Sequence, residues 1–235
     1  MVDMGPPQSM RMGGTGAAGA QSTTPAPATA TATAWASCME LERRLKAESR
    51  KRSFWDPEVR RLRLALQSAY EGLIFADYAY AVSKDVEQLI WKSVHYRPIE
   101  EFRNRLKIAG QAVAQPGPAG AEAQPQQQKL LSAYLKFLDE AISSYKRLVW
   151  KLQYVYGQCG AIGVEIDASV QNDIVQKTLQ APAGTAPSPS HLVHKFLIYL
   201  GDLNRYQATA MKGSRTEWTR AIQWYRSAAA VLPSR

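Results

Sequence analysis

A long apolar stripe between positions 134 and 155 is the strongest constraint on how this chain can fold. Its members recur at alternating spacings of four and three residues: Tyr134, Leu138, Ala141, Tyr145, Leu148, Leu152 and Val155. On an α-helix this spacing places every member on one face, which must pack against other helices. No segment of the chain alternates with period two for long, as a half-buried strand would. The sequence therefore predicts an all-α fold, built as an antiparallel array of helices.

Two helix starts are marked by a capping residue followed by proline. Asp56-Pro57 and Ser188-Pro189 each supply an N-cap and a proline at the first helical position. The first start predicts a helix that continues to about Val82. Pro98 interrupts another helical pattern and is expected to kink that helix or to leave a backbone carbonyl free. Further helices are predicted over residues 37–52, 85–108 and 216–231.

Two segments differ in composition from the helical pattern around them. Residues 1–36 are mostly Gly, Ala, Thr, Pro, Ser and Met, and residues 110–128 are rich in Gln, Pro, Ala and Gly. Such compositions bury too little apolar surface to offset the entropy of ordering the chain. We therefore expect a disordered low-complexity tail over 1–36 and one helical domain over 37–235, with flexible insertions at about 110–128 and 160–187.

Net charge and cysteine content narrow the possible functions. The formal charge of +9 and the pI of about 9.6 favour anionic partners, such as phosphoproteins, nucleic acids or acidic lipids. Cys38 and Cys159 lie far apart, which argues against a disulfide framework or a zinc site and favours a reducing compartment. No run of about 18 apolar residues occurs, so no membrane span is expected.

Catalytic motifs are absent from the sequence, which has no GxSxG, HExxH or Gly-rich phosphate loop. We therefore expect a non-enzymatic protein with neither a catalytic site nor a cofactor. His191 and His194 lie three residues apart and would share a helical face, but two ligands without a third do not define a metal site. A pair of surface histidines is the simpler interpretation, so no metal is expected.

Basic and aromatic residues are interleaved on the helix predicted over residues 85–108. The basic residues are Lys92, Arg97, Arg103, Arg105 and Lys107, and the aromatic ones are Trp91, His95, Tyr96 and Phe102. This combination could bind single-stranded nucleic acid through phosphate contacts and base stacking, or receive a phosphorylated side chain. The alternative is that the aromatic residues belong to the core and the basic residues form its solvated side.

The segment FLIYLGDLNRYQ, residues 196–207, carries a charged pair and a tyrosine on an otherwise apolar helix. Arg205 has the forked guanidinium that suits a phosphate, Asp202 lies one turn earlier, and Tyr206 can add a hydroxyl donor. The same spacing also fits an ordinary ion pair between Asp202 and Arg205, worth roughly a few tenths of a kcal/mol. Spacing alone leaves the ion pair as the simpler interpretation.

The last two predicted helices have the pattern of a tetratricopeptide pair. Ala221, Tyr225, Ala228 and Pro233 have the spacing of the second helix of that repeat, and Leu200-Gly201 matches the small-residue step of the first. The connection between them, ATAMKGSRTEW, is longer than in the regular repeat. A single repeat cannot bury its own face, so these helices must pack on the preceding ones or on residues beyond Arg235.

Several segments carry a family resemblance. LGDLNRYQ resembles the GDxxRY segment of 14-3-3 proteins. HKFLIYLGDLNRYQ and AIQWYRSAAAVLP together resemble the N-terminal domain of the Est1/SMG family, the telomerase-associated and nonsense-mediated-decay adaptors. ALQSAYEGLIFADYAYAVSKDVEQLIWKSVHYRPIEEFRNRLK is similar to the early helices of that family. The resemblance runs from about Pro57 to the C-terminus, outside the insertions, and implies a 14-3-3-like domain that merges into tetratricopeptide helices.

The resemblance also implies a phosphate-binding site. The arginine of GDxxRY is Arg205, with Tyr206 beside it. The basic residue from the earlier helix is Arg97 if one gap is allowed, whereas Tyr96 takes that position without the gap, and Lys92 is the remaining candidate. In the decay adaptors this domain binds phosphoserine or phosphothreonine motifs of the surveillance helicase. The expected partners are therefore a phosphorylated helicase or other phosphoprotein and a paralogous adaptor, in the cytoplasm and nucleus.

A telomerase-associated module is the alternative function. The telomerase branch of the family is linked to telomerase RNA and to single-stranded telomeric DNA, so this alternative expects binding of single-stranded nucleic acid. The family continues past the final LP with a Gly and a further helix, whereas this chain stops at Ser234-Arg235. We therefore expect a C-terminally truncated module, and we expect no cleavage activity because no nuclease domain is present.

Overall fold

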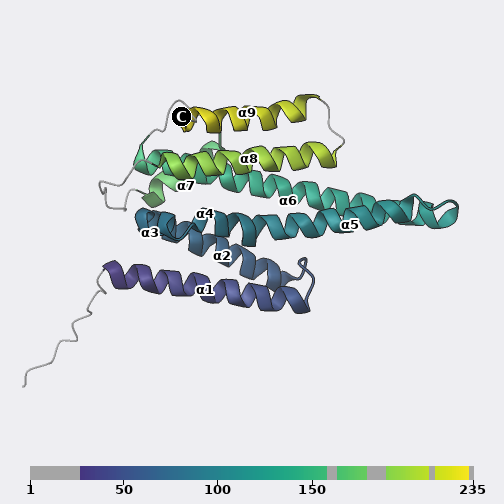
Figure 1. The fold of residues 1–235 in the computed structure, drawn as a ribbon, viewed down its shortest axis with the longest axis horizontal. Helices are drawn as coiled ribbons and strands as arrows, with labels where there is room; N and C mark the ends of the chain where they lie inside the picture. The colour runs from purple at the N-terminus through teal and green to yellow at the C-terminus, as the bar shows by residue number, and fades with distance from the viewer. Residues whose placement is uncertain (1–26, 158–162, 179–188, 212–214, 233–235) are drawn as a thin grey trace, which may run out of the picture.

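The computed structural model describes residues 27–157, 163–178, 189–211 and 215–232 (Figure 1). Within these ranges every regular element is a helix, which confirms the predicted all-α class. The long helices lie side by side in chain order, with α1 at one edge and α9 at the other, and successive long helices run in opposite directions (Figure 1). In chain order the elements are α1 (Pro27–Lys51), α2 (Pro57–Ala76), α3 (Tyr78–Ser83), α4 (Val86–Leu89), the π-helix η1 (Ile90–Tyr96), α5 (Arg97–Val113), α6 (Pro118–Tyr156), α7 (Ala168–Thr178), α8 (Ser190–Ala210) and α9 (Arg215–Val231).

Helix α6 is the centre of the core. Six of the seven stripe residues are buried, and Val155 near the end of the helix is half-buried. The ring of Tyr145 lies 5.4 Å from Phe196 and 5.6 Å from Tyr199, both on α8, and 6.3 Å from Trp91 on η1. The stripe therefore joins the early helices of the array to α8.

The N-cap predicted at Asp56 is present. Its Oδ1 accepts a hydrogen bond from the Glu58 N–H at 2.9 Å, and Pro57 follows as the first helical residue. The helix ends at Ala76 instead of continuing to Val82, because Asp77 has a non-helical backbone and caps a new helix through the Tyr80 N–H at 3.0 Å. The capping side chain breaks the apolar pattern into α2 and α3.

Helix α1 is joined to its neighbours through the half-buried carboxylate of Glu42. One oxygen of Glu42 accepts a hydrogen bond from the Tyr70 hydroxyl of α2 at 2.9 Å, and the other accepts from the Ser93 hydroxyl of η1 at 2.7 Å. Cys38 and Leu45 are buried on the same side of α1. These contacts hold the first helix against α2 and η1.

The expectation of disorder was wrong for residues 27–36 and for most of 110–128. Helix α1 begins at Pro27, where Thr31 donates to Asp77 at 3.2 Å and Trp35 packs edge-on against Tyr80. Helices α5 and α6 run side by side to the same end of the array, where residues 114–117 join them, and Gly117, directly before α6, has a φ of 90° that suits a residue without a Cβ (Figure 1). Ala, Gln and Glu have high helix propensities. The expectation of disorder was based on the low apolar content of these segments and did not take this propensity into account.

The remaining predicted flexible regions fall largely outside the described residues. Residues 1–26, 158–162 and 179–188 are not described, and they include much of the tail and of the insertion expected at 160–187. Between the last two of these ranges the chain forms α7. Across the part of the chain that is described, no helix combines the length and apolar character needed to cross a membrane.

Pro98 distorts its helix without breaking it. The helical path continues from Val86 to Val113, but it passes through the π-helix Ile90–Tyr96 directly before the proline. There the Arg97 N–H donates to the carbonyl of Lys92, five residues earlier. The distortion predicted at Pro98 therefore takes the form of a π-helix.

His95, on this π-helix, is buried. Its ring lies 5.0 Å from the Tyr145 ring, and within the described residues neither ring nitrogen has a hydrogen-bond partner. Burial, helped by the nearby Arg63 guanidinium, lowers the pKa of His95 to about 3. The imidazole is therefore neutral at physiological pH.

Candidate functional site

Helices α8 and α9 pack most closely at Gly201. A Cβ added to this glycine would lie 2.5 Å from Cε1 of Tyr225, too near for any side chain to fit without displacing the ring. Ala221 and Ala228 are buried on the facing side of α9. The small residues that the sequence analysis singled out thus allow the two antiparallel helices to approach each other (Figure 1).

Asp202 links Arg205 to α9. Its Oδ1 accepts hydrogen bonds from the Tyr225 hydroxyl at 2.8 Å and from Nη2 of Arg205 at 3.0 Å. The ion pair considered from the spacing of these residues is therefore present. Burial lowers the pKa of Arg205, but hydrogen bonds to Asp202 and Tyr225 more than offset this, and the pKa lies above its ordinary value. The Arg205 side chain remains 43% exposed, so its other N–H groups can meet a ligand.

Tyr206 brings a second cation to this surface. Its ring centroid lies 4.8 Å from the guanidinium carbon of Arg205 and 5.4 Å from that of Arg103 on α5. We call Arg103, Arg205 and Tyr206 the α5–α8 cluster. Cation–π contacts of this kind hold both guanidinium groups beside one aromatic ring.

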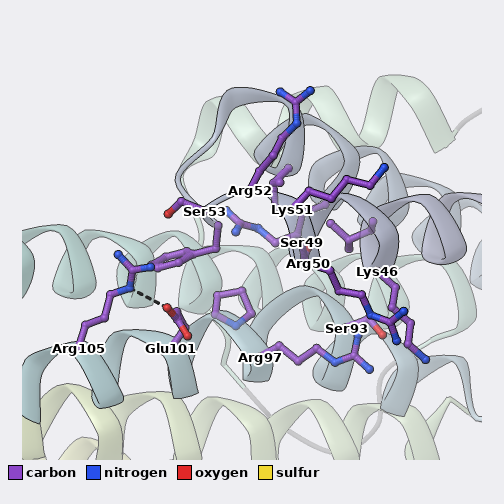
Figure 2. Close-up of a pocket in the computed structure, with 15 residues that line it drawn as sticks. Lys46, Ser49, Arg50, Lys51, Arg52, Ser53, Ser93, Arg97, Glu101 and Arg105 are labelled. Carbon is purple, nitrogen blue, oxygen red and sulfur yellow. Dashed lines mark hydrogen bonds and ion pairs between the residues drawn. The ribbon is translucent and has the colours of Figure 1, made fainter. Parts of the chain in front are cut away.

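Among the described residues, no contact joins the other two predicted phosphate ligands, Arg97 and Lys92, to Arg205 or Tyr206. Arg97 lines a cavity of about 590 Å³ together with Lys46 and Arg50 of α1, and the residues lining this cavity include neither Arg205 nor Tyr206 (Figure 2). Lys92 is exposed, and its Nζ donates to Oε1 of Gln88 at 3.2 Å. The structure brings Arg205 and Tyr206 together with Arg103, and it directs Arg97 toward α1.

Sequence reasoning did not single out Arg103, although it was among the basic residues of its helix. The available signal was spacing, because Arg103 follows Tyr96 by seven residues, which is about two helical turns. A hydrogen bond to Glu100 raises the pKa of the Tyr96 hydroxyl, and the nearby Tyr206 raises it further. Tyr96 therefore lies near Tyr206, as Arg103 does.

The aromatic residues of the third predicted helix are mainly part of the interior. Phe102 is buried, and the half-buried Trp91 stacks on Tyr199 of α8 at 4.6 Å with an interplanar angle of 3°. This stacking fixes α8 against η1. The interpretation in which aromatic residues are core and basic residues form the solvated side therefore describes Trp91 and Phe102.

The two histidines of α8 do not form a metal site in the described residues. His194 contacts the backbone oxygen of Ala228 through Nδ1 at 2.9 Å, whereas His191 is exposed. Among the side chains that the structure describes, no group of three or more His, Cys, Asp and Glu is placed to hold a metal ion. His194 instead adds a contact between α8 and α9.

Comparison with known proteins gives a consistent set of relatives. The family described as "Telomerase activating protein Est1" matches residues 85–211. The chain is 28% identical over 194 residues to "Nonsense-mediated mRNA decay factor SMG7" of Arabidopsis thaliana, covering 80% of this chain and 18% of the relative. The SMG7 protein of Danio rerio is 26% identical over 197 residues, covering 81% of this chain and 14% of the relative. "Telomerase-binding protein EST1A" of Danio rerio is 27% identical over 179 residues, covering 73% and 10%.

These matches include the cluster described above. Arg103, Arg205 and Tyr206 all lie within residues 85–211, the range of the family match. The chain spans less than a fifth of the length of each of these relatives. Because the family match covers more than half of the chain, the chain belongs to the Est1 family.

Proposed function

We propose that this chain is a non-enzymatic adaptor module that binds phosphoserine or phosphothreonine motifs of a partner protein in nonsense-mediated mRNA decay. The observation that carries the proposal is the α5–α8 cluster, in which two guanidinium groups flank one tyrosine. Two relatives are named as factors of this decay pathway, which supports the assignment of the process. A phosphorylated surveillance helicase or other phosphoprotein is the proposed partner, and a paralogous adaptor is a second one, in cytoplasm and nucleus.

The geometry suits a phosphate group. A guanidinium can donate two parallel hydrogen bonds to phosphate oxygens, and a phosphoserine carries a charge near −2 at neutral pH. Asp202 orients Arg205 through Nη2 and is itself held by Tyr225, so the remaining donors of Arg205 are positioned before a ligand arrives. We assign the second cation to Arg103, which already faces Tyr206, and we retain Lys92 as a further candidate.

Peptide binding decides between this function and a purely structural role for Arg205. Fluorescence anisotropy would compare phosphorylated and unphosphorylated Ser-Gln peptides on the parent and on Arg205→Glu, Arg103→Glu and Arg97→Glu. Loss of a charge-assisted contact should weaken phosphopeptide binding by about tenfold or more for Arg205→Glu and Arg103→Glu. Arg97→Glu and the exposed control Lys107→Glu should bind like the parent.

The opposite results have clear meanings. Equal affinity for the two peptides, or unchanged binding by Arg205→Glu, would refute phosphopeptide recognition at this cluster. Reduced stability of Arg205→Ala without any change in binding would assign the residue to the ion pair with Asp202 alone. Circular dichroism of each variant shows whether lost binding reflects lost folding.

The telomerase-associated alternative draws on the relative named as telomerase-binding. It requires aromatic rings that can stack on bases, and among the aromatic residues interleaved with the basic residues of 85–108, Phe102 is buried and Trp91 is already stacked on Tyr199. This is why phosphopeptide binding is our primary proposal. Binding of single-stranded telomeric DNA or telomerase RNA with a steep salt dependence would favour the alternative, since each neutralised phosphate releases a counterion.

A further inference from the structure

The cavity that contains Arg97 is strongly basic and lies on a different surface from the α5–α8 cluster. It is bounded by α1, the connection to α2, α2 itself, η1 and the start of α5, and has a volume of about 590 Å³ (Figure 2). Seven of its fifteen lining residues are Lys or Arg, and Glu101 is the one acidic residue among them. Cavities of several hundred Å³ are large enough for a small ligand.

Part of this positive charge is already neutralised. Arg105 is paired with Glu101 at 2.7 Å, and both Arg52 and Lys51 are paired with Glu48. In contrast, Lys46, Arg50 and Arg97 form no ion pair with any described residue. Figure 2 shows the ends of these three side chains gathered beside Ser93. Three uncompensated cations from two helices therefore converge on one place.

Arg63 of α2 adds a buried charge to the lining. Its exposed fraction is 8%, its guanidinium carbon lies 5.1 Å from the Phe137 ring centroid, and it forms no ion pair within the described part of the chain. Burial and the neighbouring Arg60 lower the pKa of Arg63 to about 10. A buried cation without a paired carboxylate is costly. Because the guanidinium lies against Phe137, which is not among the lining residues, Arg63 favours an anion in the cavity as background charge and not as a direct ligand.

The surrounding charges indicate a compact ligand instead of an extended strand. Arg43, Arg60 and Arg61 lie near the cavity along α1 and α2, and each is paired with a glutamate at distances between 2.7 and 3.9 Å. A nucleic-acid strand needs cations that continue along its backbone. On α1 and α2, the cations that form no ion pair with a described residue are Lys46, Arg50 and Arg63, and all three line the cavity. On these two helices the charge pattern therefore fits several phosphates on a small framework.

We propose that this cavity binds a compact polyphosphorylated ligand, either a free small molecule or a lipid headgroup, with Lys46, Arg50 and Arg97 as its phosphate ligands. The ammonium and guanidinium groups donate hydrogen bonds to the phosphate oxygens, and Arg63 provides background positive charge from the wall. This activity goes beyond phosphopeptide binding, because it uses another surface and other residues. The two sites can therefore fail or succeed independently.

Isothermal titration calorimetry with inositol hexakisphosphate tests the proposal on the full chain. We expect one bound ligand per chain, and the double variant Arg50→Glu/Arg97→Glu should weaken binding by about 100-fold, roughly tenfold for each charge-assisted contact removed. Lys107→Glu changes the net charge by the same amount as each single substitution, on an exposed part of α5. This control and Arg205→Glu should change the affinity by less than about threefold, as expected for screened surface charges.

Vesicle flotation distinguishes the two sources of phosphate. Comparing vesicles that contain phosphatidylinositol bisphosphate with neutral vesicles shows whether the chain binds a headgroup at a membrane surface. Binding either to these vesicles or to inositol hexakisphosphate in solution supports the site, provided that the double variant loses it. The proposal is overturned if the chain binds neither ligand, or if Lys107→Glu weakens binding as much as the double variant does. Tighter binding of a single-stranded oligonucleotide than of inositol hexakisphosphate, lost in the same double variant, also overturns the compact-ligand assignment. Thermal melting by circular dichroism shows that each variant is folded.

Discussion

Replacing Gly201 by alanine should destabilise the protein, even though alanine favours helices. The added Cβ would lie 2.5, 2.7 and 2.8 Å from three atoms of the Tyr225 ring, whereas carbon atoms pack at about 3.5–4.0 Å. The ring must therefore move by about 1 Å, and it is tied to Asp202 by a hydrogen bond of 2.8 Å. Overpacking costs about 1–3 kcal/mol. Losing a hydrogen bond to a charged group costs about 1.5–3 kcal/mol more, while helix propensity returns about 1 kcal/mol.

The expected net loss in the free energy of unfolding is therefore about 1.5–5 kcal/mol. Urea denaturation followed by circular dichroism measures it. Gly72 provides a matched control, because it also lies inside a helix but has nothing within 4 Å of the added Cβ. Gly72→Ala should stabilise the protein by up to about 1 kcal/mol.

A second control removes the obstructing ring. In a Tyr225→Ala background, Gly201→Ala should no longer destabilise and should behave like Gly72→Ala. If Gly201→Ala were as harmless as Gly72→Ala in the parent, the close approach of α8 and α9 would not have the energetic importance that we assign to it.

Three further predictions concern polar groups that are buried or half-buried. Glu42→Ala removes the acceptor of the Tyr70 and Ser93 hydroxyls and should lower the free energy of unfolding by about 1–3 kcal/mol. Glu42→Gln keeps one acceptor and should lower it by less. If the parent and Glu42→Ala were equally stable, the hydrogen bonds of Glu42 would not hold α1 in place. Burial depresses the pKa of folded His95 to about 3 from an ordinary 6.5, so the unfolded state binds more protons and the free energy of unfolding decreases as the pH is lowered. Between pH 6.5 and 5 the free energy of unfolding of the parent, measured by urea titration, should fall by about 1.6 kcal/mol more than that of His95→Leu. If stability changed with pH equally in the two proteins, the imidazole would be solvated in the folded state. Burial raises the pKa of the Cys38 thiol to about 11. In the Cys159→Ser variant, a maleimide should therefore label Cys38 only after the protein unfolds. Rapid labelling of Cys38 in the folded protein would show that α1 opens readily.

The helices that could be predicted from the sequence are those whose side chains meet the core periodically. The stripe from Tyr134 to Val155 needs no information beyond helical geometry. Asp56-Pro57 could be interpreted for a similar reason, because an N-cap depends on its immediate neighbours. Asp77 escaped notice because it lies in an apolar pattern, and its capping role depends on a local backbone turn that periodicity does not detect.

The candidate site was only partly predictable. Arg205, Tyr206 and the ion pair to Asp202 share one helix, so their spacing determined their proximity. The choice between Arg103 and Arg97 as the second cation, in contrast, depends on how α5 packs against α8, and these two helices are far apart in sequence. That assignment depends on which side of α5 faces α8, and the π-helix before Pro98 changes this orientation in a way that an α-helical projection does not include.

The length of the π-helix Ile90–Tyr96 has a consequence for evolution and for protein engineering. The wide π-helical turn takes up one residue more than an α-helical turn, so deleting one residue from this stretch would restore α-helical bonding while α5 keeps its direction relative to α4. Arg97 should then stay at the cavity beside α1, and Arg103 should stay at Tyr206. A deletion in the α-helical part of α5, where successive residues differ in direction by about 100°, would instead turn the following residues away from their neighbours. The π-helix is therefore a place where the chain can lose one residue without moving either anion-binding surface.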